Sequence, residues 1–244
     1  MNVLDLAISR EDEGGVLAAS VHLPNRLPAP VVVCCHGLMS SKESTKFVAL
    51  CKAFCADGLA AVRFDFSGCG SSSPASTLNL IDARMRDLFR ILDFISEVPW
   101  SNGWTGLLGS SLGGYLALLA AGSGHFSIGG LVCWATPFDL RRINLLSEET
   151  GVADTFRAAL DSTDHPVELS GLAPVPGVLV IHGQRDETVA WTDALDLYRR
   201  VGEPKRLLLL EGADHRILDP DCRDLALRTS LEWFIERAVP QSGK

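Results

Sequence analysis

The chain has 244 residues, of which 47% are apolar and 21% are charged. A single domain of this length buries roughly 70–75% of the surface that its unfolded chain exposes, so its core requires neither a disulfide nor a metal. The composition argues against disorder, because the apolar content is too high and the charge too low. The net charge of −8 and the lack of any Lys/Arg run argue against nucleic acid or an anionic membrane as the main partner.

The seven cysteines are odd in number, form no Cys-x-x-Cys pair and lie mostly in apolar runs. We therefore expect reduced thiols in the core of a cytoplasmic protein, with no metal site. The N-terminus lacks a basic region followed by a long apolar stretch, so we predict no secretory signal. Residues 98–138 contain no Asp, Glu, Lys or Arg, but nine glycines interrupt them and argue against a membrane span.

Two segments at the N-terminus, residues 3–8 and 15–23, have the pattern of antiparallel edge strands. Six short and almost entirely apolar runs follow, as is typical of parallel strands that are covered on both faces. These predicted strands comprise residues 31–35, 60–65, 105–109, 130–134, 178–182 and 206–211.

Segments of helical period alternate with these strands. The predicted helices comprise residues 45–57, 80–98, 112–121, 191–201 and 221–238. This alternation favours a single α/β domain with a doubly wound, mostly parallel sheet. Residues 137–176 depart from it, because they have no strand pattern and only one short predicted helix, at 153–160. Since such a segment is long for a plain connection, we expect a lid over the C-terminal edge of the sheet.

The sequence Gly109-Ser110-Ser111-Leu112-Gly113 lies directly between a predicted strand and a predicted helix. This is the context of a Gly-x-Ser-x-Gly nucleophile elbow, in which close approach of the backbone demands small residues on both sides of the serine. Ser111 is therefore the candidate nucleophile, and the N–H of Leu112 at the helix N-terminus is a candidate donor to an oxyanion. Ser110 is the competing serine, but leucines occupy the two positions at the same spacing around it. The pentapeptide by itself also fits an ordinary strand–helix turn.

A second candidate element is His36-Gly37-Leu38, which directly follows the predicted strand 31–35. Active sites of doubly wound sheets collect at the C-terminal ends of the strands, so this loop should lie near Ser111. Gly37 allows the backbone to turn so that the N–H of Leu38 faces the oxyanion from the other side. We interpret His36 as a structural histidine that binds loop backbone, rather than as a catalytic base.

A serine nucleophile needs an adjacent base, and a histidine base needs a carboxylate that fixes its tautomer. Asp186 and His215 follow successive predicted strands, in the chain order Ser, Asp, His that this arrangement requires. Asp214 is the rival acid, but neighbouring residues in a tight turn rarely present their side chains to each other. His182 ends a strand and is expected to brace the loop of Asp186.

Taken together, these pieces resemble the α/β-hydrolase superfamily, and most of all its compact esterases related to cinnamoyl (feruloyl) esterases and dienelactone hydrolases. The resemblance extends from about residue 30 to residue 220. The matching pieces are residues 36–38 and 40–43, residues 63–71, the elbow at Ser111, the loop of Asp186 and residues 212–215.

The resemblance implies an eight-stranded, mostly parallel sheet with a lid between the sixth and seventh strands. It also implies that Ser111 is the nucleophile, His215 the base and Asp186 the orienting acid. The N–H groups of Leu38 and Leu112 would form the oxyanion hole.

Two residues depart from the pattern of the family. Cys69 stands where a Gly-His-Gly turn often has histidine, which should be tolerable because that turn is structural. Ser110 precedes the nucleophile where histidine or glutamine is more usual, so the elbow should be braced differently.

We therefore expect a cytoplasmic serine hydrolase that cleaves carboxylic esters of small to medium acyl or aromatic acids, without a metal or an organic cofactor. Its expected partner is a small-molecule ester, with no nucleic acid and no membrane span, and we allow for a homodimer. A thioesterase or an acyl-peptide hydrolase would use the same triad, so these alternatives stay open. A non-catalytic protein that binds a ligand on the same fold is the alternative from another class.

Overall fold

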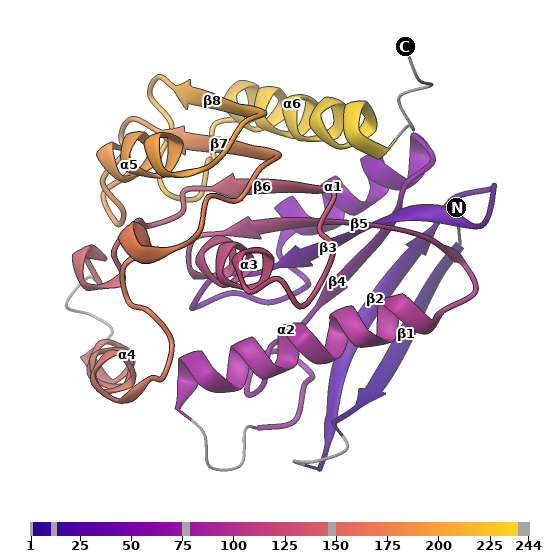
Figure 1. Ribbon diagram of the computed structural model, residues 1–244, viewed down its shortest axis with the longest axis horizontal. Helices are drawn as coiled ribbons and strands as arrows, with labels where there is room; N and C mark the ends of the chain where they lie inside the picture. The colour runs from indigo at the N-terminus through magenta and orange to yellow at the C-terminus, as the bar shows by residue number, and fades with distance from the viewer. Residues whose placement is uncertain (1, 11–13, 75–78, 146–149, 239–244) are drawn as a thin grey trace.

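The computed structural model describes residues 2–10, 14–74, 79–145 and 150–238. Eight strands form one twisted sheet with the order β1-β2-β4-β3-β5-β6-β7-β8 (Figure 1). The strands are β1 (Asn2–Ser9), β2 (Val16–Leu23), β3 (Ala29–Cys35), β4 (Ala60–Phe64), β5 (Ser101–Ser110), β6 (Gly130–Trp134), β7 (Val178–Gly183) and β8 (Lys205–Leu210). All pairings from β4 to β8 are parallel, which confirms the mostly parallel, eight-stranded sheet.

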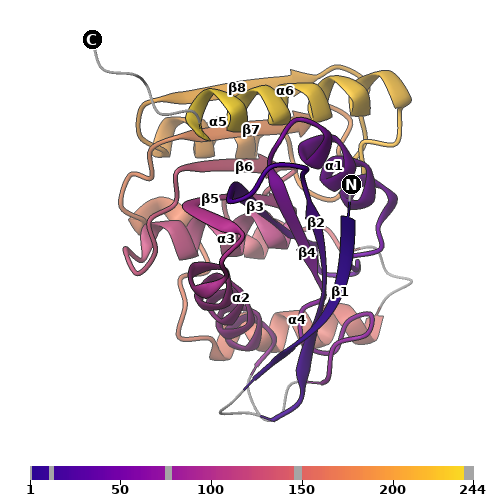
Figure 2. The ribbon, with the colours of Figure 1, turned by 90° about the vertical axis from the view of Figure 1, so that its right-hand side faces the viewer.

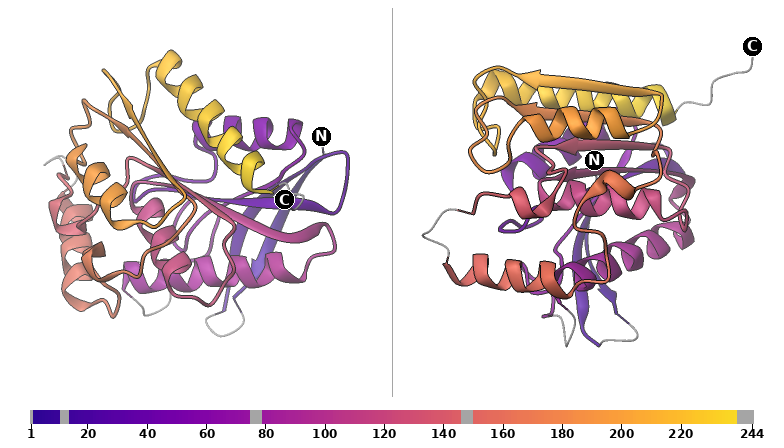
Figure 3. Two further views of the ribbon diagram at one scale, coloured as in Figure 1. Left: turned by 45° about the horizontal axis from the view of Figure 1, so that its top comes forward. Right: turned by 60° about the vertical axis from the view of Figure 1, so that its left-hand side comes forward.

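Helices cover both faces of the sheet. They are α1 (Thr45–Ala56), α2 (Leu80–Glu97), α3 (Leu112–Gly122), α4 (Thr150–Ser162), α5 (Thr192–Arg200) and α6 (Pro220–Ala238). Helices α1 and α6 lie on one face of the sheet, and α2, α3 and α5 lie on the other (Figure 3). Their buried side chains belong to two apolar cores, one on each face. Alternate residues of β3 enter the two cores, Val31 and Val33 on one side and Val32 and Cys34 on the other. This double burial explains why the central strands are continuous apolar runs.

The two ends of the sheet correct details of the sequence-based prediction. β1 is an edge strand, but β2 lies between β1 and β4 and is antiparallel to both (Figure 2). β8 pairs only with β7 and forms the other edge, so most of its residues are only partly buried. Leu207 and Leu209 nevertheless pack against one core and Leu208 and Leu210 against the other, so β8 is covered on both faces as predicted. Its apolar run did not reveal its edge position.

The segment between β6 and β7 contains the 3-10 helices η1 (Leu140–Arg142) and η3 (Leu169–Gly171) with α4 between them. Its described residues contain no strand, only an isolated bridge between Asp139 and Glu168. Phe156 and Ala159 of α4 are buried in the core on the α2 side of the sheet. Residues 146–149, which belong to the predicted lid 137–176, lie outside the described residues. None of the helices in the described part of the chain combines the length and the apolar character needed to cross a bilayer.

Candidate active site

Ser111 lies in a strained turn at the junction of β5 and α3. Its backbone has φ 55° and ψ −126°, a conformation that is uncommon for a residue other than glycine. A Cβ atom on Gly109 would lie 2.4 Å from the backbone of Gly114, and one on Gly113 would lie 2.2 Å from the carbonyl oxygen of Cys35. Both positions therefore require glycine, as the elbow interpretation demands.

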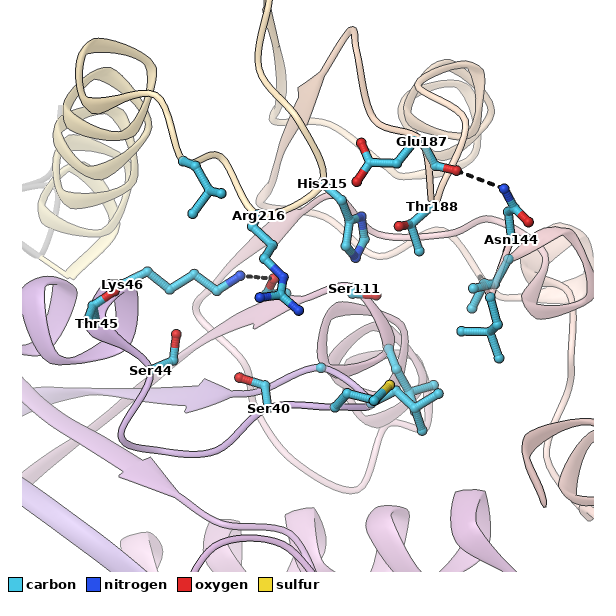
Figure 4. A pocket seen from close by; sticks show the side chains of 18 of the residues that line it. Ser40, Ser44, Thr45, Lys46, Ser111, Asn144, Glu187, Thr188, His215 and Arg216 are labelled. Atoms are coloured by element: carbon cyan, nitrogen blue, oxygen red, sulfur yellow. Dashed lines mark hydrogen bonds between the residues drawn. The ribbon is translucent and has the colours of Figure 1, made fainter. Parts of the chain in front are cut away.

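Four of the five site residues that the sequence singled out line one cavity of about 340 Å³. Leu38, Ser111, Leu112 and His215 all contribute to its wall. They follow the C-terminal ends of different parallel strands, which meet at one edge of the sheet. Figure 4 shows the imidazole of His215 extending from the loop after β8 toward the side chain of Ser111.

Asp186 holds His215 by a hydrogen bond of 2.8 Å between the carboxylate Oδ2 and the imidazole Nδ1. The Asp186 side chain is fully buried, and its Oδ1 accepts from the backbone N–H groups of Thr188 and Val189. Burial opposes ionisation of this carboxyl, but the hydrogen bonds from His182 and His215 outweigh that effect and hold its pKa well below the usual range. Asp186 is thus a carboxylate at neutral pH, and Nε2 is the ring nitrogen of His215 left to face Ser111.

His182 and Asp214, the polar side chains next to this pair, stabilise the loops that carry Asp186 and His215. Nε2 of the buried His182 lies 3.0 Å from the carbonyl oxygen of Val189 and 3.1 Å from Oδ2 of Asp186, so it braces this loop as expected. The rival carboxylate, Asp214, accepts a hydrogen bond of 2.8 Å from the backbone N–H of Leu218. Asp214 therefore stabilises the turn after His215.

His36 holds the loop that follows β3. Its Nδ1 donates to the carbonyl oxygen of Gly37 at 2.8 Å, and its Nε2 accepts from the N–H of Phe66 at 3.1 Å. Burial and the nearby Arg84 lower the pKa of His36 to about 3, so the ring is neutral and cannot leave these partners to act as a base. The expectation of a structural histidine is confirmed.

Arg84 of α2 braces the same loop and was not singled out in the sequence. Its buried guanidinium donates to the carbonyl oxygens of Gly37 at 3.3 Å and Leu38 at 3.0 Å, and to Sγ of Cys69 at 3.3 Å. Because Arg84 binds the carbonyl oxygens of both Gly37 and Leu38, the backbone N–H of Leu38 is fixed relative to the cavity. Among the described residues, neither the N–H of Leu38 nor that of Leu112 has an acceptor. Cys69, which stands where the resemblance implies histidine, thus contacts the arginine that braces this loop.

Lys46 is the second contributor that sequence reasoning missed. From the first turn of α1 it lines the cavity, and its Nζ donates to Oγ of Ser110 at 2.6 Å (Figure 4). This hydrogen bond is the different bracing of the elbow that Ser110 suggested. The sequence did contain a signal for this role. A lysine in the first turn of a helix is unfavourable because it opposes the helix dipole, so its presence there indicates an interaction outside the helix.

No arrangement of three or more His, Cys, Asp or Glu side chains that could hold a metal ion occurs among the described residues. The chemistry available at this cavity is that of a strained serine, a histidine held by a buried carboxylate, and two backbone N–H groups at the ends of neighbouring elements. Such a set can activate a hydroxyl and stabilise a developing oxyanion.

The chain is similar to several known proteins. Residues 27–149 match the family described as serine aminopeptidase, S33. The human palmitoyl-protein thioesterase ABHD10, mitochondrial, is 27% identical over 213 residues, which cover 78% of this chain and 68% of that protein.

Solved structures of low sequence identity share the fold. Est1E from Butyrivibrio proteoclasticus, solved with bound ferulic acid, superposes with a TM-score of 0.79 at 19% identity and covers 95% of this chain and 98% of its own. Dienelactone hydrolase from Anabaena variabilis superposes with a TM-score of 0.69 at 19% identity, with 98% and 99% covered. The resemblance drawn from the sequence motifs is thereby confirmed. The chain belongs to the serine aminopeptidase S33 family of α/β-hydrolases and is a serine hydrolase.

Proposed function

We propose that this serine hydrolase cleaves carboxylic esters through an acyl-enzyme on Ser111. His215 acts as the base, Asp186 orients it, and the N–H groups of Leu38 and Leu112 bind the oxyanion. The observation that carries the proposal is the shared cavity, in which a serine on a strained elbow faces an imidazole fixed by a buried carboxylate.

The geometry supports a two-step reaction. Nε2 of His215 takes the proton of Ser111 as Oγ attacks the carbonyl carbon, and the carbonyl oxygen becomes the oxyanion. When this intermediate collapses, the ester C–O bond breaks and His215 protonates the departing alcohol. His215 then deprotonates a water that attacks the acyl-enzyme, so the acid leaves and Ser111 regains its proton. The kinetics should be ping-pong.

The cavity favours small to medium acyl groups or aromatic acids. Its volume of about 340 Å³ lies at the lower end of the range of roughly 300–1,000 Å³ that is usual for ligand pockets. Ile143 and Leu145, from the segment between β6 and β7, line it beside Leu38 and Leu112. We propose that this segment, residues 137–176, is a lid insertion within the single domain of residues 1–244 and selects the acyl group.

Replacement of Ser111 tests this mechanism. Ser111→Ala should lower kcat for p-nitrophenyl and hydroxycinnamate esters by about 10⁴–10⁶-fold, because no other group can form the acyl-enzyme. Ser123→Ala is the matched control, because Ser123 is exposed at the end of the same helix and should leave kcat unchanged. Turnover near the wild-type level in the Ser111 variant would eliminate the mechanism.

Thioester hydrolysis is the second candidate, since a relative at 27% identity is named as a palmitoyl-protein thioesterase. The same serine attack would release a thiol in place of an alcohol. Values of kcat/KM on an ester, a thioester and an anilide of one acid decide between the bond types. Our proposal predicts that the ester or the thioester exceeds the anilide, whereas preference for the anilide would support an acyl-peptide hydrolase.

We further propose a reducing compartment, with the cytoplasm as the expected location. All seven cysteines are free, and Cys34, Cys35, Cys51, Cys55 and Cys133 are buried. Fractionation of source cells tests the location, and light scattering after gel filtration tests the homodimer that we allow for.

A further inference from the structure

Three cationic side chains gather on one side of Ser111 in the cavity. Lys46 comes from α1, whereas Arg216 and Arg223 come from the turn after His215 and from the start of α6. Figure 4 shows the guanidinium of Arg216 between Lys46 and Ser111, with Asn144 and Thr188 on the opposite side of the serine. Segments far apart in sequence thus converge to place positive charge beside the reacting hydroxyl.

These cations lack acidic partners. Within the described residues, Lys46, Arg216 and Arg223 form no ion pair, although the chain as a whole carries a net charge of −8. Nζ of Lys46 donates to a hydroxyl, and the guanidinium of Arg223 donates to the carbonyl oxygen of Leu218. Arg216 has no hydrogen-bond partner in that part of the chain, so its guanidinium is free to bind a ligand.

The acidic groups nearby are engaged elsewhere. Asp214 accepts from the N–H of Leu218, and Asp186 is held by its two histidines and two backbone N–H groups. Glu187 is the acidic side chain among the described residues that line the cavity, and Figure 4 places it on the far side of His215 from Lys46. Asp214 and Asp186 still act on Lys46 through space and raise its pKa, but burial and the charges of Arg216 and Arg223 outweigh them. No carboxylate among the described residues therefore forms a direct ion pair on the cationic side of the cavity.

Gathering like charges in a partly closed cavity costs free energy, which a bound anion would offset. The cost is visible at Lys46, where burial and the charge of Arg216 lower the pKa to about 8. Ser44, Thr45 and Lys46 at the start of α1 also line this side, where the positive end of the helix dipole favours an anion. Away from the cations, the wall combines the apolar Leu112, Ile143 and Leu145 with Asn144, Thr188 and Glu187, and it carries no further positive charge.

We propose that the cationic side of the cavity, made by Lys46, Arg216 and Arg223, is a subsite for an anionic oxygen group of the substrate. The preferred substrate is then an ester with one apolar part and one part that carries a carboxylate or a phosphate. The subsite rests on the proposed esterase function and specifies its substrate class. Arg216 supplies planar donors that can bind such a group in bidentate fashion.

Matched pairs of substrates test the subsite. In the first pair the leaving group is charged or neutral, 3-carboxyphenyl butyrate against 3-carbamoylphenyl butyrate. In the second pair the acyl group is charged or neutral, phenyl hydrogen adipate against phenyl adipamate. A third compound, 3-phosphonophenyl butyrate, distinguishes a phosphate from a carboxylate. We expect a charged member to exceed its neutral partner in kcat/KM by about tenfold, the usual worth of a charge-assisted hydrogen bond.

Substitutions test whether the cationic side of the cavity causes that preference for charged substrates. Arg216→Gln and Arg223→Gln should each reduce the charged-to-neutral ratio, and Arg216→Glu should reverse it. Arg199→Gln removes the same charge from the exposed face of α5 and should leave the ratio at the wild-type value. A wild-type ratio within twofold of one for every pair would overturn the subsite, as would a preference that persists in both Gln variants.

Failure of the subsite can be told apart from failure of the esterase proposal. If the neutral esters are turned over and charge has no effect, only the subsite is wrong. If wild-type protein hydrolyses none of the five compounds, the esterase proposal itself is contradicted.

Discussion

Asp186 illustrates how local contacts determine the ionisation of a single side chain. Two backbone N–H groups and two histidines surround its carboxylate, and their hydrogen bonds overcome the cost of burial. Asp186 is therefore negatively charged at neutral pH, and this charge is hydrogen-bonded to Nδ1 of His215. This charge fixes the proton on Nδ1 and stabilises the imidazolium that forms when Ser111 is deprotonated.

Asp186→Asn should therefore lower kcat for ester hydrolysis by about 10⁴-fold, because the amide no longer selects the correct tautomer of His215. Asp214→Asn is the matched change at the rival carboxylate and should have a much smaller effect, since Asp214 contacts the N–H of Leu218. Steady-state kinetics on one ester measure both. An equal loss in the two variants would contradict the assignment of Asp186.

The sequence revealed some site residues and not others for a physical reason. Ser111 directly follows a strand, and Asp186 and His215 each lie three residues after a glycine that follows or ends a strand, so the local pattern marks them. Lys46 and Arg84 lie within helices, and their roles depend on which strands and loops lie opposite. Only the packing of distant segments shows that Arg84 lies beneath the loop of Leu38.

Helix α2 braces the loop of residues 36–38, the proposed source of one oxyanion donor, through the side chain of Arg84. Arg84→Met should lower kcat by about tenfold or more, with little change in KM, because a mobile Leu38 N–H stabilises the transition state less than a fixed one. Arg228→Met alters an exposed arginine on α6 and should behave like wild-type protein. If Arg84→Met changed only KM, or nothing, the proposed bracing would be wrong.

The elements themselves were largely predictable, because strands buried on both faces and amphipathic helices have distinct periods. The predicted strand at 130–134 coincides with β6, and the predicted helix at 80–98 ends one residue from the end of α2. The order of the strands in the sheet was harder to predict from the sequence. The inner position of β2 and the edge position of β8 depend on pairing partners far away in the sequence, which the local pattern does not record.

The whole fold has an acid-sensitive point at His36. Its folded-state pKa of about 3 lies below the ordinary value of 6.5, so the unfolded chain binds the extra proton between these values. The free energy of unfolding is therefore unaffected by His36 above about pH 6.5 and decreases as the pH falls toward 3. Between pH 7 and pH 5 this group should cost about 2 kcal/mol of stability.

Urea unfolding at pH 7 and pH 5 measures this loss. His36→Gln removes the titrating group, so the variant, although less stable at pH 7, should show a smaller decrease between the two pH values than wild-type protein. His125→Gln is the matched control, because His125 is exposed in a loop and should leave the decrease unchanged. An identical decrease in all three proteins would show that His36 is not buried as a neutral ring.

We have proposed that the hydroxyl of Ser111, activated by His215, is the nucleophile of this hydrolase. The most direct measurement is intact-protein and peptide mass spectrometry after reaction with a fluorophosphonate ester, which forms a stable adduct only with an activated serine. We expect one adduct on Ser111, its retention in Ser110→Ala and its loss in both Ser111→Ala and His215→Ala. An adduct on Ser110, or labelling that survives replacement of Ser111, would show that another group is the nucleophile.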